Sequence, residues 1–275
     1  MAKVSSALLK RRLDIAEIVR KQGEIKVDKL SDMLQVSHVT IRHDLTYLEQ
    51  QGYLKRSFGG AIYIVPEADL NRTTTPASNN STTIDSQIGL VKTCLSYIND
   101  GETIFLGHGN VIRKLIPFLH TKKSLKLIMN DISNAQLVKE FLDAEVILVG
   151  GALLDGNILY DPETVKVFLN QLTISHFIVE LAAINKDNQV VIKNMEQLKT
   201  YQQILKITQH TIGILPQIVS YHDNNILGKL KHMDMVILSR PTVTEYHQQL
   251  LETNFKQYTT NKYCVTYHNI TRGMK

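Results

Sequence analysis

Side chains that can bind DNA are concentrated around one predicted helix and the hairpin that follows it. The helix has Ile41, Leu45 and Leu48 on one face, which we expect to be buried, and its other face and N-terminus are free. A helix held in this way can present hydrogen-bond donors and positive charge to base edges and phosphates. The candidate DNA-contacting residues are Ser37, His38, Thr40, Arg42 and His43 on the helix, and Lys55 and Arg56 on the hairpin.

Two further helices are expected before this one. Apolar residues at helical spacing predict a helix over residues 6–22, which Gly23 ends. Val27, Leu30 and Leu34 then form the apolar face of a second, shorter helix. The DNA-contacting helix must bury its own apolar face to be held rigidly, and these helices supply the surface for it.

Capping and turn residues define the third helix and a hairpin. Ser37 is placed as the N-cap of a helix over residues 38–51, and Gly52 ends that helix. Residues 53–56 and 60–63 can then pair around a Gly-Gly turn. Three short helices followed by a basic hairpin form a winged helix-turn-helix. The alternative is a three-helix packing module with a charged surface.

The positive charge of the chain is concentrated in the same segment. The whole chain has 31 basic and 26 acidic residues, and residues 1–62 alone hold 11 and 7 of them. A local basic excess favours attraction to a polyanion such as DNA. The excess is modest, and taken alone it favours an ordinary solvated face.

Composition separates this segment from a larger second part. Residues 66–86 are rich in Thr, Ser, Asn and Pro and predict a linker. We therefore expect a DNA-binding domain over residues 1–65, an α/β domain over 87–258 and a basic C-terminal tail over 259–275 with no assigned role. The second domain alternates helical patterns with apolar runs typical of strands buried on both faces of a parallel sheet, at 103–106, 125–130, 145–150, 176–184, 211–216 and 235–239.

Several protein classes are excluded by composition. No apolar run approaches the roughly 18–20 residues of a membrane span, and the charged N-terminus is unlike a signal peptide. Cys94 and Cys264 match no metal or redox spacing, the histidines are scattered, and the Gly-His-Gly-Asn loop at 107–110 is not a dinucleotide fingerprint. We therefore expect a cytoplasmic protein with no metal, no cofactor and no membrane partner.

Residues 37–61 carry a close resemblance to a known family. The segment SHVTIRHDLTYLEQQGYLKRSFGGA resembles the signature of the DeoR family of bacterial transcriptional regulators, and the resemblance covers residues 5–63. Arg11 and Arg12 match the basic residues usual in the family's first helix, while His43 replaces an arginine and removes one permanent positive charge. The matching residues are Ser37, Thr40, Ile41, Arg42, Asp44, Leu45, Leu48, Glu49, Gly52, Leu54, Arg56, Gly59, Gly60 and Ala61.

Residues 88–255 resemble the sensor domain of the same family. This resemblance implies a Rossmann-like parallel α/β sheet related to ribose-5-phosphate isomerase and similar sugar-phosphate enzymes. In the family this domain binds phosphorylated sugars or related metabolites, which shift the affinity for DNA. The candidate effector-binding residues are His108, Gly109, Asn110, Asn130, Gly150, Gly151, Asn194, Glu196 and Lys199.

Some of the sensor-domain residues usual in the family are replaced in this chain. An acidic residue is lost at Gly107, tandem hydroxyl groups are lost at Asn110 and Val111, and a later Asp and Lys are lost around Pro216 and Ser220. These departures argue against isomerase chemistry, which needs a carboxylate base and charge-stabilising groups beside the sugar. They also argue that a sugar phosphate is not bound in the usual way.

The sequence thus predicts a transcriptional repressor of a metabolic operon, and not an enzyme. It would bind a double-stranded DNA operator as a homo-oligomer, a dimer or a tetramer, and respond to a small phosphorylated metabolite. Two alternatives stay open: a regulator whose sensor domain has lost ligand binding and only oligomerises, and a sugar-phosphate-binding or isomerising enzyme. Single candidates also have plainer interpretations, His108 as a loop histidine, Gly150-Gly151 as a turn, and Glu196 with Lys199 as a surface pair.

Overall fold

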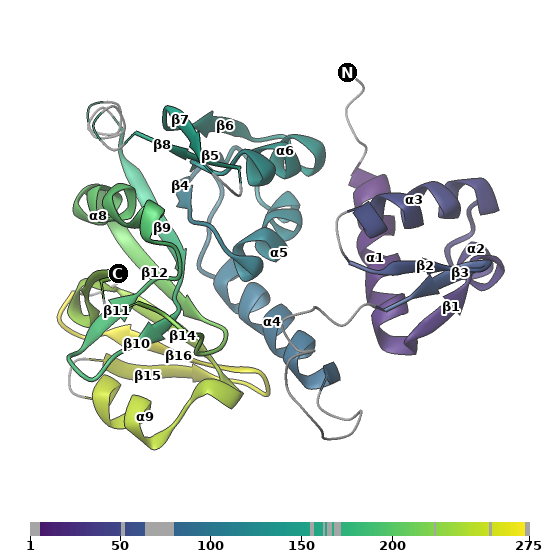
Figure 1. Cartoon of the computed structure of the whole chain (residues 1–275). Helices are drawn as coiled ribbons and strands as arrows, with labels where there is room; N and C mark the ends of the chain where they lie inside the picture. The colour runs from purple at the N-terminus through teal and green to yellow at the C-terminus, as the bar shows by residue number, and fades with distance from the viewer. Residues whose placement is uncertain are drawn as a thin grey trace. The chain divides into compact units, whose positions relative to one another are not determined.

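The chain forms two compact units, Met1–Asn80 and Ser81–Lys275, each with its own hydrophobic core (Figure 1). No helix in the part that the structure describes is long and apolar enough to cross a membrane. The predicted helix end at Gly52 and residues 66–79 of the predicted linker lie outside the described residues. The structure is a computed structural model that describes residues 6–50, 53–63, 80–154, 157–161, 163, 167, 172–222, 224–252 and 255–272.

The N-terminal unit is a winged helix-turn-helix, as the sequence predicts. Its sheet has the antiparallel order β1-β3-β2, and β1 is a strand that the sequence analysis did not anticipate. A Cβ on Gly60 would collide with the backbone carbonyl of Ile25, so glycine lets the wing approach β1. The elements are α1 (Ser6–Gln22), β1 (Glu24–Lys26), α2 (Val27–Leu34), α3 (His38–Gln50), β2 (Lys55–Ser57) and β3 (Gly60–Ile62).

The three helices of this unit meet in one small apolar core. Ile15 and Val19 of α1, Leu30 of α2, and Ile41 and Leu45 of α3 are at most 1% exposed. Burying one such side chain contributes about 1.5–3 kcal/mol, so α3 is held by the face that its sequence spacing predicts. The opposite face of α3 is left to the solvent.

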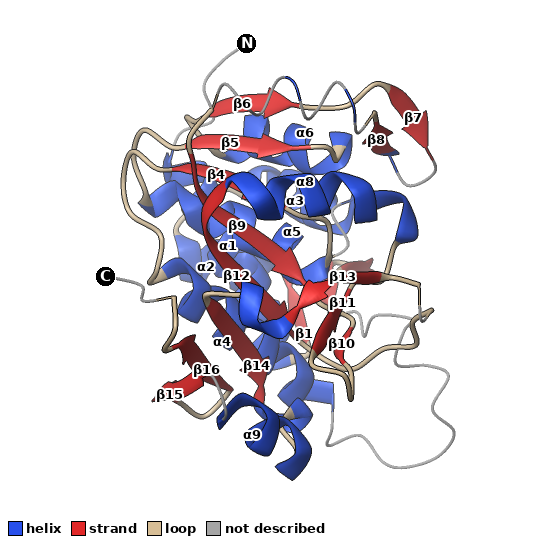
Figure 2. Cartoon of the chain, turned by 90° about the vertical axis from the view of Figure 1, so that its left-hand side faces the viewer, coloured by secondary structure: helices blue, strands red, loops and turns tan. Residues whose placement is uncertain are grey.

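The C-terminal unit is built on one eight-stranded sheet of order β15-β16-β14-β12-β9-β4-β5-β6 (Figure 2). Neighbouring strands from β14 to β6 are parallel, which confirms the predicted parallel α/β class. The strands are β4 (Thr103–Leu106), β5 (Lys126–Met129), β6 (Glu145–Leu148), β9 (Ile174–Glu180), β12 (Thr208–Leu215), β14 (Met235–Ser239), β15 (Phe255–Thr260) and β16 (Cys264–Asn269).

Helices cover both faces of this sheet, with α5 on one face and α8 on the other (Figures 1 and 2). Two small sheets, β10-β11-β13 and β7-β8, accompany it. The remaining elements are α4 (Asn80–Leu95), α5 (Asn110–Phe118), α6 (Ile132–Phe141), α8 (Leu198–Ile207), α9 (Glu245–Glu252), the 3₁₀ turns η2 (Leu119–Thr121), η4 (Met195–Gln197), η5 (Leu230–His232) and η6 (Arg240–Thr242), and the strands β7 (Ala152–Leu154), β8 (Ile158–Tyr160), β10 (Ala183–Ile184), β11 (Gln189–Val191) and β13 (Ile226–Lys229).

The C-terminal residues differ from the expected tail over 259–275. Strand β16 lies between β14 and β15 and pairs with both, so Cys264–Asn269 are part of the main sheet. Tyr267 is 2% exposed, and the polar residues Thr266 and Asn269 are buried beside it. The strand was missed because its polar residues hide the apolar pattern by which a buried strand is recognised.

Two other boundaries also differ from the expectation. Residues 80–86, assigned to the linker, begin α4. The run 145–150 was predicted to be buried on both faces, but β6 is an edge strand, and Glu145 and Leu148 are exposed. An edge strand has a neighbour on one side only, so it is covered less completely than the strands inside the sheet.

Candidate DNA-binding surface and effector site

Helix α3 begins with the predicted side-chain cap. The amide of Thr40 donates a hydrogen bond to Ser37 Oγ at 3.2 Å, and the hydroxyls of the two residues lie 2.9 Å apart. This cap satisfies one of the free amides at the helix start. The predicted role of Ser37 as the N-cap is therefore confirmed.

A buried carboxylate joins α3 to α1. Asp44 is 1% exposed, and its two oxygens accept hydrogen bonds from Arg11 Nε at 2.6 Å and from Arg12 Nε at 2.9 Å. The Arg12 guanidinium also lies 3.8 Å above the ring centre of Tyr47, another α3 residue. Arg11 and Arg12 thus fix the orientation of α3, a role that the sequence analysis did not assign to them.

The predicted DNA-contacting residues of α3 lie on its free side. His38, Arg42 and His43 are exposed, and Thr40 is half-buried next to the cap. His38 Nε2 lies 3.6 Å from the exposed carboxylate of Asp28 on α2. The described part of α3 therefore offers one guanidinium group and two imidazole groups to a partner.

The wing is fastened to α3 through Arg56. Its amide donates a hydrogen bond to Glu49 Oε1 at 2.8 Å, and its Nη1 donates to Thr46 Oγ1 at 3.0 Å. Lys55 is exposed beside it, and Phe58 at the tip of the hairpin is fully exposed. The wing thus keeps a fixed position relative to α3, which was not foreseen from the spacing of its basic residues.

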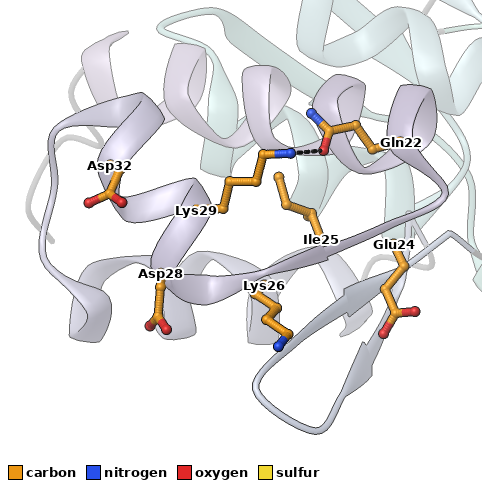
Figure 3. A pocket seen from close by; sticks show the side chains of 7 residues that line it. All are labelled: Gln22, Glu24, Ile25, Lys26, Asp28, Lys29 and Asp32. Atoms are coloured by element: carbon orange, nitrogen blue, oxygen red, sulfur yellow. Dashed lines mark hydrogen bonds between the residues drawn. The ribbon is translucent and has the colours of Figure 1, made fainter.

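A surface hollow of about 600 Å³ lies where α1, β1 and α2 meet (Figure 3). Lys29 Nζ donates a hydrogen bond across it to Gln22 Oε1 at 3.0 Å. Three carboxylates face two ammonium groups in its lining, so the hollow is unsuited to phosphate or DNA. It is lined by Gln22, Glu24, Ile25, Lys26, Asp28, Lys29 and Asp32.

In the C-terminal unit, polar groups gather where β4 and β5 end. His108 follows β4, and its Nδ1 lies 2.6 Å from Asp131 Oδ2. Asp131 is 2% exposed, and its other oxygen caps α6 by accepting from the Asn134 amide at 3.0 Å. The His108 side chain is 40% exposed, so this hydrogen-bonded pair is accessible to a small molecule.

A second carboxylate meets the start of α5. The amide of Val111 donates a hydrogen bond to Glu180 Oε2 at 2.7 Å, and Glu180 is the last residue of β9. Gly109, the N-cap residue, has φ +147, and a Cβ there would collide with the Glu180 carboxylate. Burial raises the pKa of Glu180, against the opposing effect of the α5 amides and His108. Burial lowers the pKa of Lys114, and Glu180 opposes that shift.

Tyr201 of α8 closes the site from the other face of the sheet. Its hydroxyl accepts a hydrogen bond from the His108 amide at 2.6 Å, and its ring packs edge-on against Phe105 and Phe177. Burial raises the pKa of Tyr201, so the hydroxyl stays protonated. The loop after β4 is therefore held from both sides of the sheet, by Tyr201 and by Asp131.

Replacing Tyr201 with Phe should weaken this loop specifically. The change leaves the His108 amide without its acceptor, which costs about 1–3 kcal/mol when the group is buried. We expect a lower thermal midpoint for the C-terminal unit, measured by circular dichroism of the full chain. Tyr258→Phe is the matched control, because Tyr258 is 69% exposed and loses the same hydroxyl. Equal destabilisation by both changes would contradict this role of Tyr201.

The structure brings six of the nine predicted effector residues to two neighbouring places. His108, Gly109 and Asn110 form the loop between β4 and α5. Asn130 lies next to Asp131, and its Nδ2 donates to the Leu159 carbonyl at 3.1 Å. Gly150 (φ +127) lies close to Leu159, and Gly151 lies close to Asp161.

The other three predicted effector residues lie at the start of α8. Glu196 and Lys199 are exposed, and Asn194 is half-buried. Among the described residues no ion pair joins Glu196 to Lys199, and no hydrogen bond joins either of them to the His108 loop. Their predicted role stays a prediction. The buried face of the same segment carries Gln197 and Thr200, whose side chains have no hydrogen-bond partner in the described part of the chain.

The sequence analysis missed Asp131, Glu180 and Tyr201. Asp131 had a local signal, since it follows a predicted strand and precedes a helix at an N-cap position. Glu180 is an acidic residue inside an apolar run, which is itself a signal of a buried charge with a partner. No group of three or more metal-binding side chains is found among the residues that the structure describes.

Comparison with known protein families decides the identity of both units. The model described as "DeoR-like helix-turn-helix domain" matches residues 11–67, and the model described as "DeoR C terminal sensor domain" matches residues 85–215. The chain belongs to the DeoR family. It is a transcriptional regulator with a helix-turn-helix domain and a sensor domain.

Relatives of this DeoR-family chain are named as repressors. The glycerol-3-phosphate regulon repressor of Escherichia coli is 26% identical over 255 residues, covering 87% of this chain and 97% of the relative. A lactose phosphotransferase system repressor of Staphylococcus epidermidis is 29% identical over 194 residues, covering 70% and 76%. Among solved structures, ribose 5 phosphate isomerase A of Neisseria gonorrhoeae is 13% identical with a TM-score of 0.36, covering 69% and 77%.

Three of the replaced residues of this DeoR-family sensor domain, Gly107, Asn110 and Val111, lie at the start of α5 or just before it. Neither Asn110, which is exposed, nor Val111, which is fully buried, carries a hydroxyl group that could bind a phosphate at this turn. The Gly107 amide donates to the Ile178 carbonyl at 2.9 Å and is not free. The amides that remain at the start of α5 face Glu180.

Proposed function

We propose that this DeoR-family regulator represses a metabolic operon by binding a double-stranded DNA operator, and that a small phosphorylated metabolite controls this binding. The proposed DNA-contacting residues are Ser37, His38, Thr40, Arg42 and His43 of the α3 segment, with Lys55 and Arg56 of the wing. The N-terminal unit serves as the DNA-binding domain, and the C-terminal unit binds the effector and joins the protomers.

The observation that carries this proposal is the way α3 is held. Its apolar face is buried, its N-terminus is capped by Ser37, and Asp44 ties it to α1 through two arginines. Arg42 and His43 project from the side that none of these contacts uses. A rigid helix with a polar, cationic free face is what reading base edges in a major groove requires.

The effector site is proposed at the ends of β4 and β5. His108 and Asp131 form an accessible hydrogen-bonded pair. The side-chain oxygen Oδ1 of Asn130 is buried and has no hydrogen-bond partner among the described residues. Such groups bind the hydroxyls of a sugar or a polyol. The names of the relatives, which mention glycerol 3-phosphate and a phosphotransferase system, support a phosphorylated compound.

Control of DNA binding requires a difference between two assembled states. Two or more heads joined by their C-terminal units would engage repeated half-sites, and their spacing must match the helical repeat of DNA. An effector changes operator affinity only if it binds the two arrangements with different affinity. We therefore propose a homo-oligomer, a dimer or a tetramer, as the active species.

One observation favours a second candidate, in which the C-terminal unit only oligomerises. The amides at the start of α5, which would suit a phosphate, are already occupied by Glu180. In that case DNA binding would not respond to any metabolite. Catalysis has no such support, because relatives over most of the chain are repressors and the family's acidic residue is lost at Gly107.

Matched pairs of ligands separate these candidates. The full chain would be tested with glycerol 3-phosphate against glycerol, and with ribose 5-phosphate against ribose, in thermal unfolding and in operator binding. A controlling ligand at 100 times its Kd should stabilise the folded protein by about 2.7 kcal/mol and change operator affinity. A wider set of sugar phosphates would then be tested. If none of them changed the thermal stability or the operator affinity, the result would favour the candidate in which the C-terminal unit only oligomerises.

A further inference from the structure

The start of α5 is closed by a carboxylate from another part of the chain. Glu180 ends β9 and lies 69 residues from Val111, whose amide it accepts at 2.7 Å. The backbone amides of Asn110 and Ile112 lie close enough to Glu180 to lower its pKa as well. The N-cap residue, Gly109, has no side chain that could cap the helix locally. The carboxylate of Glu180 therefore takes the place of an ordinary cap.

Free amides at a helix start form a place for an anion. Their N–H groups and the helix dipole together favour a phosphate, a sulfate or a carboxylate. In this chain the anion is internal, and the turn fits closely around it, since a Cβ on Gly109 would collide with the Glu180 carboxylate. The turn is thus shaped to hold an anionic group, and the group it holds belongs to the protein.

The buried position of Glu180 disfavours the ionised form of its side chain. Burial opposes its ionised form and raises its pKa, and the amides only partly offset that effect. A carboxylate held against such a cost is easier to displace than one in a solvated ion pair. Lys114 lies near enough to interact with Glu180, while its ammonium donates a hydrogen bond to Gln87 Oε1.

A second observation points to a ligand at the same edge of the sheet. Asn130 directly follows β5, the neighbour of β4, and is 1% exposed. Its Oδ1 has no hydrogen-bond partner among the described residues. Buried oxygens of this kind are nearly always satisfied in the functional state. A ligand hydroxyl beside Asp131 would provide the missing donor.

We propose that Glu180 is an internal anion that occupies the phosphate subsite of the sensor domain, and that the effector binds by displacing it. This inference rests on the proposed function, in which a phosphorylated metabolite binds at the ends of β4 and β5. Two anions cannot share the same amides, so the phosphate and the Glu180 carboxylate are mutually exclusive. Displacement frees the end of β9 and changes the contacts of α5, which supplies two distinct arrangements of the domain.

An internal competitor lowers the affinity for every external anion. The apparent Kd equals the intrinsic Kd divided by the fraction of molecules in which the subsite is open. Removing the carboxylate should therefore tighten phosphate binding. This expectation is opposite to that for a residue that contacts the effector directly, whose loss would weaken binding.

Isothermal titration of inorganic phosphate into the full chain tests the proposal. We expect Glu180→Gln to bind phosphate at least about tenfold more tightly than the unchanged protein, because the closed fraction is lost. Glu102→Gln is the matched control. It removes one negative charge at the opposite end of β4, where Glu102 pairs with His176 at 3.1 Å. This control should leave phosphate affinity unchanged.

Two results would overturn the proposal. One is a folded Glu180→Gln protein, checked by circular dichroism, with unchanged phosphate affinity. The other is an equal gain in Glu102→Gln, which would indicate a general effect of charge. If Glu180→Gln does not fold, Glu180→Asp is measured in its place, because the shorter side chain keeps the charge but retracts from the amides. Glu180→Asp should also bind phosphate more tightly than the unchanged protein. Unchanged phosphate affinity in this variant would overturn the proposal.

Operator binding of the same proteins is measured separately, without phosphate. Absence of operator binding would count against the proposed function while leaving the phosphate result interpretable. Unchanged phosphate affinity in a protein that binds its operator would count against the role of Glu180 alone.

Discussion

Replacing Asp44 with Asn is expected to release α3 from α1 and to abolish operator binding. The carboxylate is 1% exposed and holds two arginine side chains at 2.6 and 2.9 Å. Removing one partner of a buried ion pair costs about 3–5 kcal/mol, and a unit of this size has little stability to spare. Hydrogen exchange of α3 amides in the full chain should accelerate by about 100-fold or more, since each 1.4 kcal/mol is a factor of ten.

Asp32→Asn is the control for this change. Asp32 lies on α2 of the same unit, carries the same charge and has an exposed side chain. We expect its hydrogen exchange and operator affinity to match those of the unchanged protein. If Asp44→Asn left exchange of the α3 amides as slow as before, the clamp between α1 and α3 would not be what holds the helix.

Replacing Arg42 with Ala should weaken operator binding strongly and leave the fold intact. Arg42 is exposed on the free side of α3, and the core residues Ile41 and Leu45 are untouched by the change. Loss of one bidentate contact to a base costs about 1–3 kcal/mol, which corresponds to roughly a 5- to 150-fold loss of affinity. Fluorescence anisotropy with a labelled operator fragment measures it.

Two comparisons make the Arg42 result specific. Lys92→Ala removes one positive charge from an exposed position on α4 and should leave operator affinity nearly unchanged. The affinity of Arg42→Ala for unrelated DNA should fall much less than its affinity for the operator, because nonspecific binding depends on phosphates. Retained operator affinity in Arg42→Ala would rule out a base-reading role for this residue.

The helices of the N-terminal unit could be predicted because their signals are local. Apolar spacing, the Ser37 cap and the Gly-Gly turn each involve residues within a few positions of one another. The clamp could not be predicted in this way. Arg11 and Asp44 are 33 residues apart, and nothing in the spacing of charges says which basic residue turns inward.

In the C-terminal unit, strand identity was easier to predict than strand neighbours. The runs that became β4, β9 and β12 are strongly apolar, and their class followed from that alone. The position of Glu180 against α5 depends on β9 pairing with β4, which brings residues about 70 positions apart together. Contacts that depend on sheet order cannot be read from the pattern of a single strand.

Salt-dependent binding to fragments of the DNA upstream of the protein's own gene is the most direct test of a sequence-specific regulator. We expect tight binding of the full chain to a few discrete, repeated sites. The logarithm of affinity should fall with the logarithm of salt concentration by about 0.9 for each phosphate contacted. Weak binding to all fragments alike would contradict operator recognition and would leave the winged helix as a nonspecific DNA-binding module.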